Sequence, residues 1–111
     1  MDKLVTYRTH IHDLLKEYAQ YKPSYGNIEV EQIIDTQNDH YQLVTVGWNG
    51  YHRVHNCLFH IDIKNGKLWI QHDGTEEGIA NWFVERNVPK SDIVLAFYAP
   101  YRRQFTDFAV E

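Results

Sequence analysis

The sequence predicts a single α+β domain over residues 1–111, with an N-terminal helix, a four-stranded antiparallel meander, a second helix and a C-terminal strand. Three observations carry this prediction. Apolar residues recur at helical spacing near the N-terminus, two Asn-Gly pairs separate runs of alternating residues, and a second amphipathic stretch ends before a proline. Because strands and helices are segregated along the chain, we expect a mainly antiparallel sheet.

The first helix is predicted over residues 3–20. Asp2 can serve as its N-cap, and Pro23 and Gly26 break helical continuity after it. An apolar stripe along the helix predicts which side is buried. The stripe consists of Leu4, Tyr7, Ile11, Leu14, Leu15 and Tyr18.

The meander is predicted from period-two alternation and from turn residues between the runs. Asn49-Gly50 and Asn65-Gly66 are strong signals for tight hairpin turns. The first three strands are expected at Ile28–Asp35, Tyr41–Trp48 and His52–Lys64, and the fourth follows Gly66.

A two-residue turn at Asn65-Gly66 would set the register of the last hairpin. The expected pairs are Ile63 with Leu68, Ile61 with Ile70, Phe59 with His72, and His60 with Gln71. The other face of the sheet would then carry Leu43, Leu58 and Trp69. Because large apolar patches are rarely left exposed, we expect that face to be covered, and we expect a homodimer.

The second helix is expected to begin at a cap on Asp73 or Thr75 and to end near Arg86. The run from Asp73 to Glu76 fits a capping box. Glu76 and Glu77 would lie in the first turn, where carboxylates suit the helix dipole. A last strand is predicted over Ile93–Tyr98.

The composition narrows the function classes. Fifteen acidic residues against eleven Lys and Arg give a formal net charge of −4, which disfavours a dedicated DNA-binding protein. No apolar run approaches the roughly 20 residues that span a bilayer, and the charged N-terminus lacks the apolar region of a signal peptide. Cys57 is the only cysteine, which favours a reducing compartment. We expect a cytoplasmic protein without membrane contacts.

Histidines raise the question of a metal site, because imidazole is a common transition-metal ligand. His52, His55, His60 and His72 cluster in sequence. The expected register scatters them, however, since His72 would share a face with Phe59 and not with His60. We therefore expect hydrogen-bonded structural histidines, with no metal and no cofactor.

The acidic group Asp73, Glu76 and Glu77, with Asp62 nearby, could bind a cation or supply an acid/base pair. Helix capping explains the same residues without a further assumption. We therefore expect no catalytic residues and a protein that is not an enzyme. A metal-dependent enzyme that uses Asp62, His72, Asp73, Glu76 and Glu77 is the less favoured alternative.

The C-terminal segment combines aromatic residues with arginines, which are enriched at protein interfaces and also stack on single-stranded nucleic acid. The acidic net charge favours a protein partner. The alternative that these side chains fold back onto the domain's own core stays open. The candidate partner-binding residues are Trp69, Tyr98, Tyr101, Arg102, Arg103, Phe105 and Phe108.

A family resemblance covers essentially the whole chain and is most specific from His60 to Phe97. Its residues include Val46-Gly47-Trp48, Arg53-Val54-His55, His60-Ile61-Asp62-Ile63, Trp69-Ile70-Gln71, Asp73-Gly74-Thr75-Glu76-Glu77-Gly78-Ile79-Ala80 and Asp92-Ile93-Val94-Leu95-Ala96-Phe97. On these residues the chain resembles the XisI-like family, the fdxN element excision controlling factors found chiefly in cyanobacteria.

The resemblance implies a regulatory role in programmed excision of a DNA element during heterocyst development. The recombination chemistry would belong to a separate recombinase, and an XisH-like protein of endonuclease fold would be the partner. DNA would then be contacted only indirectly. The family has no established catalytic residues to carry over. A competing hypothesis is a direct DNA-binding regulator that uses Lys64, Lys67, Arg102 and Arg103.

Overall fold

The computed structural model describes residues 2–111. The elements are α1 (Lys3–Ala19), β1 (Asn27–Asp35), β2 (His40–Asn49), β3 (His52–Lys64), β4 (Lys67–Asp73), α2 (Ile79–Val84), the 3-10 helix η1 (Lys90–Asp92), β5 (Ile93–Leu95) and α3 (Pro100–Arg103).

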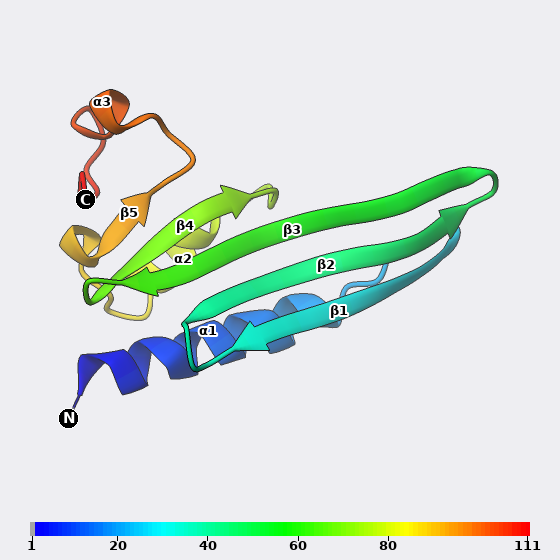
Figure 1. The fold of residues 1–111 in the computed structure, drawn as a ribbon, viewed down its shortest axis with the longest axis horizontal. Helices are drawn as coiled ribbons and strands as arrows, with labels where there is room; N and C mark the ends of the chain where they lie inside the picture. The colour runs from blue at the N-terminus through cyan, green and yellow to red at the C-terminus, as the bar shows by residue number, and fades with distance from the viewer. Residues whose placement is uncertain (1) are drawn as a thin grey trace.

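The strands form one sheet in the order β1-β2-β3-β4-β5 (Figure 1). β1 to β4 pair antiparallel in sequence order, and β5 joins β4 in parallel after the crossover through α2. The predicted α+β class, with its N-terminal helix, four-stranded meander, second helix and C-terminal strand, is therefore confirmed. None of the helices in residues 2–111 is long and apolar enough to cross a membrane.

Helix α1 follows the sequence prediction closely. Asp2 caps it, because its carboxylate accepts a hydrogen bond from the N–H of Leu4 at 2.9 Å. In Figure 1, α1 and α2 lie behind the strands, so both helices cover the same face of the sheet. The buried stripe of α1 is Tyr7, Ile11, Leu14 and Leu15.

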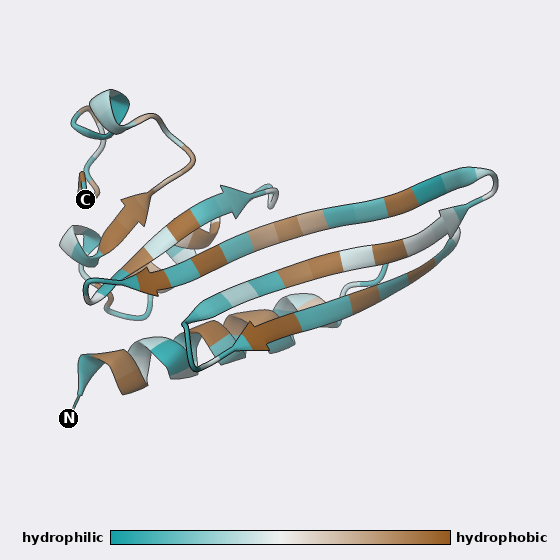
Figure 2. Cartoon of the chain, viewed as in Figure 1, coloured by the Kyte–Doolittle hydropathy of each residue, from teal (hydrophilic) through white to brown (hydrophobic). Residues whose placement is uncertain are grey.

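Apolar and polar residues alternate along the long strands (Figure 2), so the two faces of the sheet differ. The face under α1 and α2, called the helix face here, carries fully buried side chains. These are Tyr41, Leu43, Phe59, Ile61, Leu68 and Ile70, which pack with Ile11, Leu14 and Leu15 of α1 and with Ile79 and Phe83 of α2. The opposite face, called the polar face, carries His40, His60, Asp62 and Gln71.

Two β-bulges change the register that the sequence predicts. Between β2 and β3, Leu43 pairs with Phe59 but Val44 pairs with Cys57, so Leu58 is an extra residue. Strict alternation is therefore broken between Cys57 and Phe59.

The second bulge lies between β3 and β4, where Gln71 is the extra residue. The predicted pairs nearest the Asn65-Gly66 turn are confirmed. Beyond the bulge the prediction is wrong, because it assumed an unbroken ladder. Ile63 pairs with Leu68 and Ile61 with Ile70 as expected, whereas His60 pairs with His72 and Phe59 with Asp73.

The apolar residues expected on a second exposed face are accounted for within the chain. Leu43 is fully buried on the helix face, and Leu58 at the bulge packs partly against the same core. Trp69 is only 9% exposed. These three residues therefore give no support to a homodimer, and the homodimer itself stays a prediction.

The second helix is shorter than predicted, since α2 spans only Ile79–Val84. After it, Asn87 adopts φ +68°, and the N–H of Val88 donates to the carbonyl of Phe83, which ends the helix as expected for a left-handed stop. The last strand is also shorter than predicted, because β5 ends at Leu95.

Candidate functional site

The loop between β4 and α2, residues 74–78, is organised by the side chain of Asp73. Its Oδ1 accepts hydrogen bonds from the N–H and the hydroxyl of Thr75, at 2.9 and 2.6 Å, and its Oδ2 accepts from the N–H of Ile79 at 2.9 Å. Thr75 Oγ1 in turn accepts from the N–H of Gly78. Asp73 therefore satisfies the first N–H group of α2 from six residues upstream.

This arrangement corrects the predicted capping box. Asp73 and Thr75 do hold the start of the helix, but the N-cap position belongs to Gly78, whose φ is +84°. That left-handed backbone favours glycine. Glu76 and Glu77 precede α2 and are exposed, so they are free of the capping role that the spacing suggested.

Gly74 docks the loop onto the first bulge. Its N–H donates to the carbonyl of Leu58 at 2.6 Å. A Cβ at this position would lie 3.0 Å from that same oxygen, closer than a side chain normally comes to backbone. A side chain at residue 74 would therefore push the loop and β3 apart by a few tenths of an ångström, so glycine favours this close approach.

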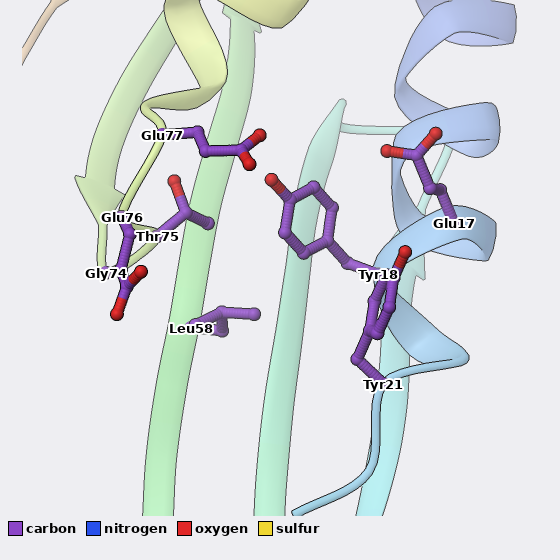
Figure 3. A pocket seen from close by; sticks show the side chains of 8 residues that line it. All are labelled: Glu17, Tyr18, Tyr21, Leu58, Gly74, Thr75, Glu76 and Glu77. Carbon is purple, nitrogen blue, oxygen red and sulfur yellow. The ribbon is translucent and has the colours of Figure 1, made fainter.

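The loop forms one wall of a pocket of about 580 Å³, called the acidic pocket here. Figure 3 shows Glu17 and Tyr18 from the last turn of α1, and Tyr21 just after it, on the side of the pocket opposite the loop residues. Much of the loop side comes from the run that carries the family resemblance. The complete lining is Glu17, Tyr18, Tyr21, Leu58, Gly74, Thr75, Glu76 and Glu77.

The electrostatics of the acidic pocket favour a cation. Burial raises the pKa of the Tyr18 hydroxyl, and the nearby carboxylates of Glu77 and Glu17 raise it further, so the phenol stays neutral. None of the described lining residues is basic, and the C-terminal end of α1 adds negative potential. Tyrosine rings beside carboxylates suit the side chain of a lysine or arginine.

A second group of titratable side chains lies on the polar face. His40 Nδ1 and His60 Nε2 each lie 2.8 Å from Oδ1 of Asp62. Gln71 Nε2 donates to Oδ2 of the same carboxylate at 3.2 Å. The hydrogen bond to Asp62 raises the pKa of His40. The three ligand atoms lie within 4.8 Å of one another, which is close enough to hold one metal ion.

Sequence reasoning missed this grouping because of the first bulge. The hairpin pairs Asn49 with His52, and an unbroken ladder from there would place His40 opposite Ile61. The extra residue at Leu58 moves the register by one, so His40 lies opposite Asp62. His40 is also far in sequence from the histidines that first drew attention, so only a prediction of the bulge could have found it.

The C-terminal segment folds back onto the sheet. Ala109 forms a bridge with Val94, and the Arg103 guanidinium donates to the carbonyls of Tyr98 and Ala96. That guanidinium also lies 5.6 Å from the ring of Trp69. Trp69 and Arg103 therefore make the contacts within the chain that the intramolecular alternative describes, and their role in partner binding stays a prediction.

The other aromatic residues divide into two groups. Tyr98 and Phe108 are half-buried and pack against the core. Tyr101 and Phe105 are 70% and 81% exposed, and the exposed Arg102 lies over the Tyr98 ring. Of the residues predicted to bind a partner, Tyr101, Arg102 and Phe105 are the ones that face solvent, and their partner role stays a prediction.

The basic residues of the DNA-binding hypothesis already have partners within the chain. Lys64 lies 4.6 Å from the centre of the Trp69 ring, and Lys67 donates to the carbonyl of Glu111. Arg102 and Arg103 contact the Tyr98 ring and backbone carbonyls. These contacts give the four cations structural roles around the C-terminal segment.

The helix-covered meander with its β4–α2 loop defines an XisI-like domain, as solved structures demonstrate. An XisI-like protein from Anabaena variabilis superposes with a TM-score of 0.92 at 44% identity, over 97% of this chain and 99% of that one. The fdxN element excision controlling factor XisI from Anabaena variabilis superposes with a TM-score of 0.86 at 34% identity, over 99% of this chain and 100% of that one.

The sequence agrees with the structural likeness. The family model described as XisI protein matches residues 1–110, so the chain belongs to the XisI family. A comparison with curated proteins found no match.

Proposed function

We propose that this chain is a non-enzymatic accessory protein that controls excision of a DNA element by binding an XisH-like protein of endonuclease fold in the cytoplasm. Family membership over residues 1–110 supports the regulatory part of this proposal. One solved relative carries the description fdxN element excision controlling factor. DNA would be reached through the partner, since the net charge of the chain is −4.

The proposal that the chain binds a partner rests mainly on the acidic pocket. Its walls combine three carboxylates with two tyrosines, and Tyr18 and Tyr21 lie edge to face with their centroids 6.1 Å apart. A lysine or arginine of the partner would gain both charge pairing and ring contact there. The wall formed by residues 74–77 is held by Asp73 and Gly74, so the pocket is formed before the partner arrives.

The first test is co-purification with an XisH-like protein, followed by size-exclusion chromatography and titration calorimetry. We expect the wild-type complex to co-elute. The double variant Glu76→Gln/Glu77→Gln removes two charges from the pocket and should weaken binding by about tenfold or more. Glu29→Gln/Glu31→Gln on β1 removes two exposed charges elsewhere and should change affinity by no more than about twofold.

The outcomes separate the partner from the pocket. Separate elution of the wild-type proteins would contradict the partner proposal as a whole. Equal losses in the two double variants would retain the partner but contradict the pocket as its binding site.

The second test addresses direct DNA binding. The chain alone should show no retention of duplex DNA even at low salt, because most of the lysines and arginines in residues 2–111 have partners within the chain. If it bound DNA with a steep inverse dependence on salt, phosphate contacts would be present and the indirect role would be wrong.

A further inference from the structure

The polar face brings two imidazoles and one carboxylate together on neighbouring strands. His40 is the first residue of β2 and lies directly opposite Asp62 on β3. His60 precedes Asp62 by two residues, so the pleat places both side chains on the same face. The grouping depends on strand pairing and on the Leu58 bulge, so it does not rest on a mobile loop.

The three side chains are arranged like the ligands of a metal site, but here they hydrogen-bond to one another. Both imidazoles direct a nitrogen at the same oxygen, Asp62 Oδ1, from 2.8 Å. Around a tetrahedral Zn²⁺, with bonds of about 2.0–2.2 Å, neighbouring ligand atoms lie about 3.3 Å apart. Each nitrogen–oxygen distance would therefore lengthen by about 0.5 Å when the ion binds, and the two nitrogens already lie within 4.8 Å of each other.

The carboxylate is supported from outside the cluster. Gln71 Nε2 donates to Asp62 Oδ2, which leaves Oδ1 for the histidines. The Asp62 side chain is 15% exposed, whereas that of His40 is 56% exposed. A hydrogen-bonded carboxylate in a partly buried position is a common way to orient metal ligands, and the exposed side of His40 leaves room for a further ligand.

We propose that His40 Nδ1, His60 Nε2 and the carboxylate of Asp62 form a binding site for a divalent transition metal, with Zn²⁺ as the best match. Two imidazoles and one carboxylate favour zinc over magnesium and calcium, which prefer oxygen ligands throughout. Three protein ligands leave a fourth position for water or for a side chain of another molecule. Metal binding requires both of these nitrogens to be free of a proton, so a neutral imidazole must carry its proton on the other ring nitrogen and a charged imidazole must release one proton. This site is independent of the acidic pocket and of the proposed partner.

The experiment titrates Zn²⁺ into full-length protein that has been stripped with a chelator, carries no histidine tag and is freed of the chelator. We expect one ion per chain at micromolar affinity or tighter. His60→Gln and Asp62→Asn should each weaken binding by about tenfold or more, and Gln71→Leu should weaken it by roughly tenfold. His52→Gln and His55→Gln, which change exposed histidines on the same strand, are the matched controls and should bind like wild type.

Two further readouts distinguish the site from a hydrogen-bonded triad. Co²⁺ in place of Zn²⁺ should give the visible absorption of a low-coordinate N/O site in wild type and in the control variants only. Zn²⁺ should raise the thermal midpoint of the wild type but not of His60→Gln, a variant whose own fold circular dichroism verifies. The proposal is overturned if wild type binds no stoichiometric ion, or if ligand and control variants lose affinity equally.

Discussion

The two faces of the sheet are built from alternating residues of the same strands, yet one face forms the apolar core and the other carries titratable side chains. On β3, Phe59 and Ile61 are fully buried beneath the helices. The neighbouring residues His60 and Asp62 point to the opposite face, where they form the polar cluster with His40. The helix face contributes most of the apolar burial, which is the dominant stabilising term in folding. The polar face carries titratable groups that are partly exposed to solvent.

The contrast teaches how a small domain can hold a site without weakening its core. Because side chains alternate across a strand, a residue on the polar face can change while its neighbours keep their packing. The bulges at Leu58 and Gln71 each shift the pairing register between neighbouring strands by one residue. The Leu58 bulge brings His40 opposite Asp62 while Phe59 and Ile61 keep their places in the core.

The most direct test of the difference between the two faces is to substitute adjacent residues on opposite faces and compare the losses of stability. Phe59→Ala should lower the free energy of unfolding by about 3–5 kcal/mol, since it leaves a cavity in a fully buried position. His60→Gln should cost less than about 1 kcal/mol, because it removes one hydrogen bond from a partly exposed group. Urea denaturation measures both values, and similar costs would mean that the two faces are not energetically distinct.

The loop that leaves the sheet should have an intermediate effect. Asp73→Ala removes the acceptor for three hydrogen bonds that hold Thr75 and Ile79, so we expect a loss of about 1–2 kcal/mol. Asp73→Asn should cause a smaller loss of stability than Asp73→Ala, because the amide oxygen can still accept hydrogen bonds. Glu76→Ala, at an exposed position of the same loop, should stay within about 0.5 kcal/mol of wild type. A neutral Asp73→Ala would show that the loop is held by other contacts.

A smaller effect on stability, which is lost in acid, is expected where α1 meets the β1–β2 turn. Arg8 pairs with both oxygens of Asp39 at 2.9 and 3.0 Å, and this pairing lowers the pKa of Asp39. A lowered folded-state pKa gives stability that is present above the ordinary value of about 3.9 and is lost as pH falls through the lowered value.

Asp39→Asn removes this titration. The stability difference between wild type and variant should therefore shrink as pH falls from neutral to about 2. Acid unfolding followed by circular dichroism tests this, with Asp13→Asn, at an exposed position of α1, as the control. A difference that stayed constant with pH would rule out the ion pair as its cause.

The smallest effects are expected at the exposed tip of the C-terminal segment. Phe105→Ser, at a side chain 81% exposed, should change stability by less than about 0.5 kcal/mol. Phe108→Ala should cost about 1–2 kcal/mol, because this ring packs partly against the core. Thermal unfolding compares the two variants. Equal losses of stability in the two variants would mean that the exposed tip and the packed part of the segment contribute alike.

Local signals were sufficient for most elements. The stripe from Tyr7 to Leu15 predicted α1 because a 3.6-residue period is visible in any amphipathic helix. Asn65-Gly66 predicted its hairpin because both residues accept positive φ, and they adopt +54° and +75°. The run from Asp73 to Gly78 was identified as distinctive, although capping alone does not account for Glu76 and Glu77.

Beyond the pairs next to the Asn65-Gly66 turn, only the tertiary structure decided which residues meet. A bulge at Leu58 or Gln71 depends on how strands, helices and the β4–α2 loop pack together, and no local pattern in the sequence specifies it. The same holds for the return of Arg103 to the Trp69 ring, since aromatic and arginine residues look alike in sequence whether they bind a partner or their own sheet. The sequence by itself therefore determined the elements and the family. The acidic pocket and the His40, His60 and Asp62 cluster exist only through long-range packing.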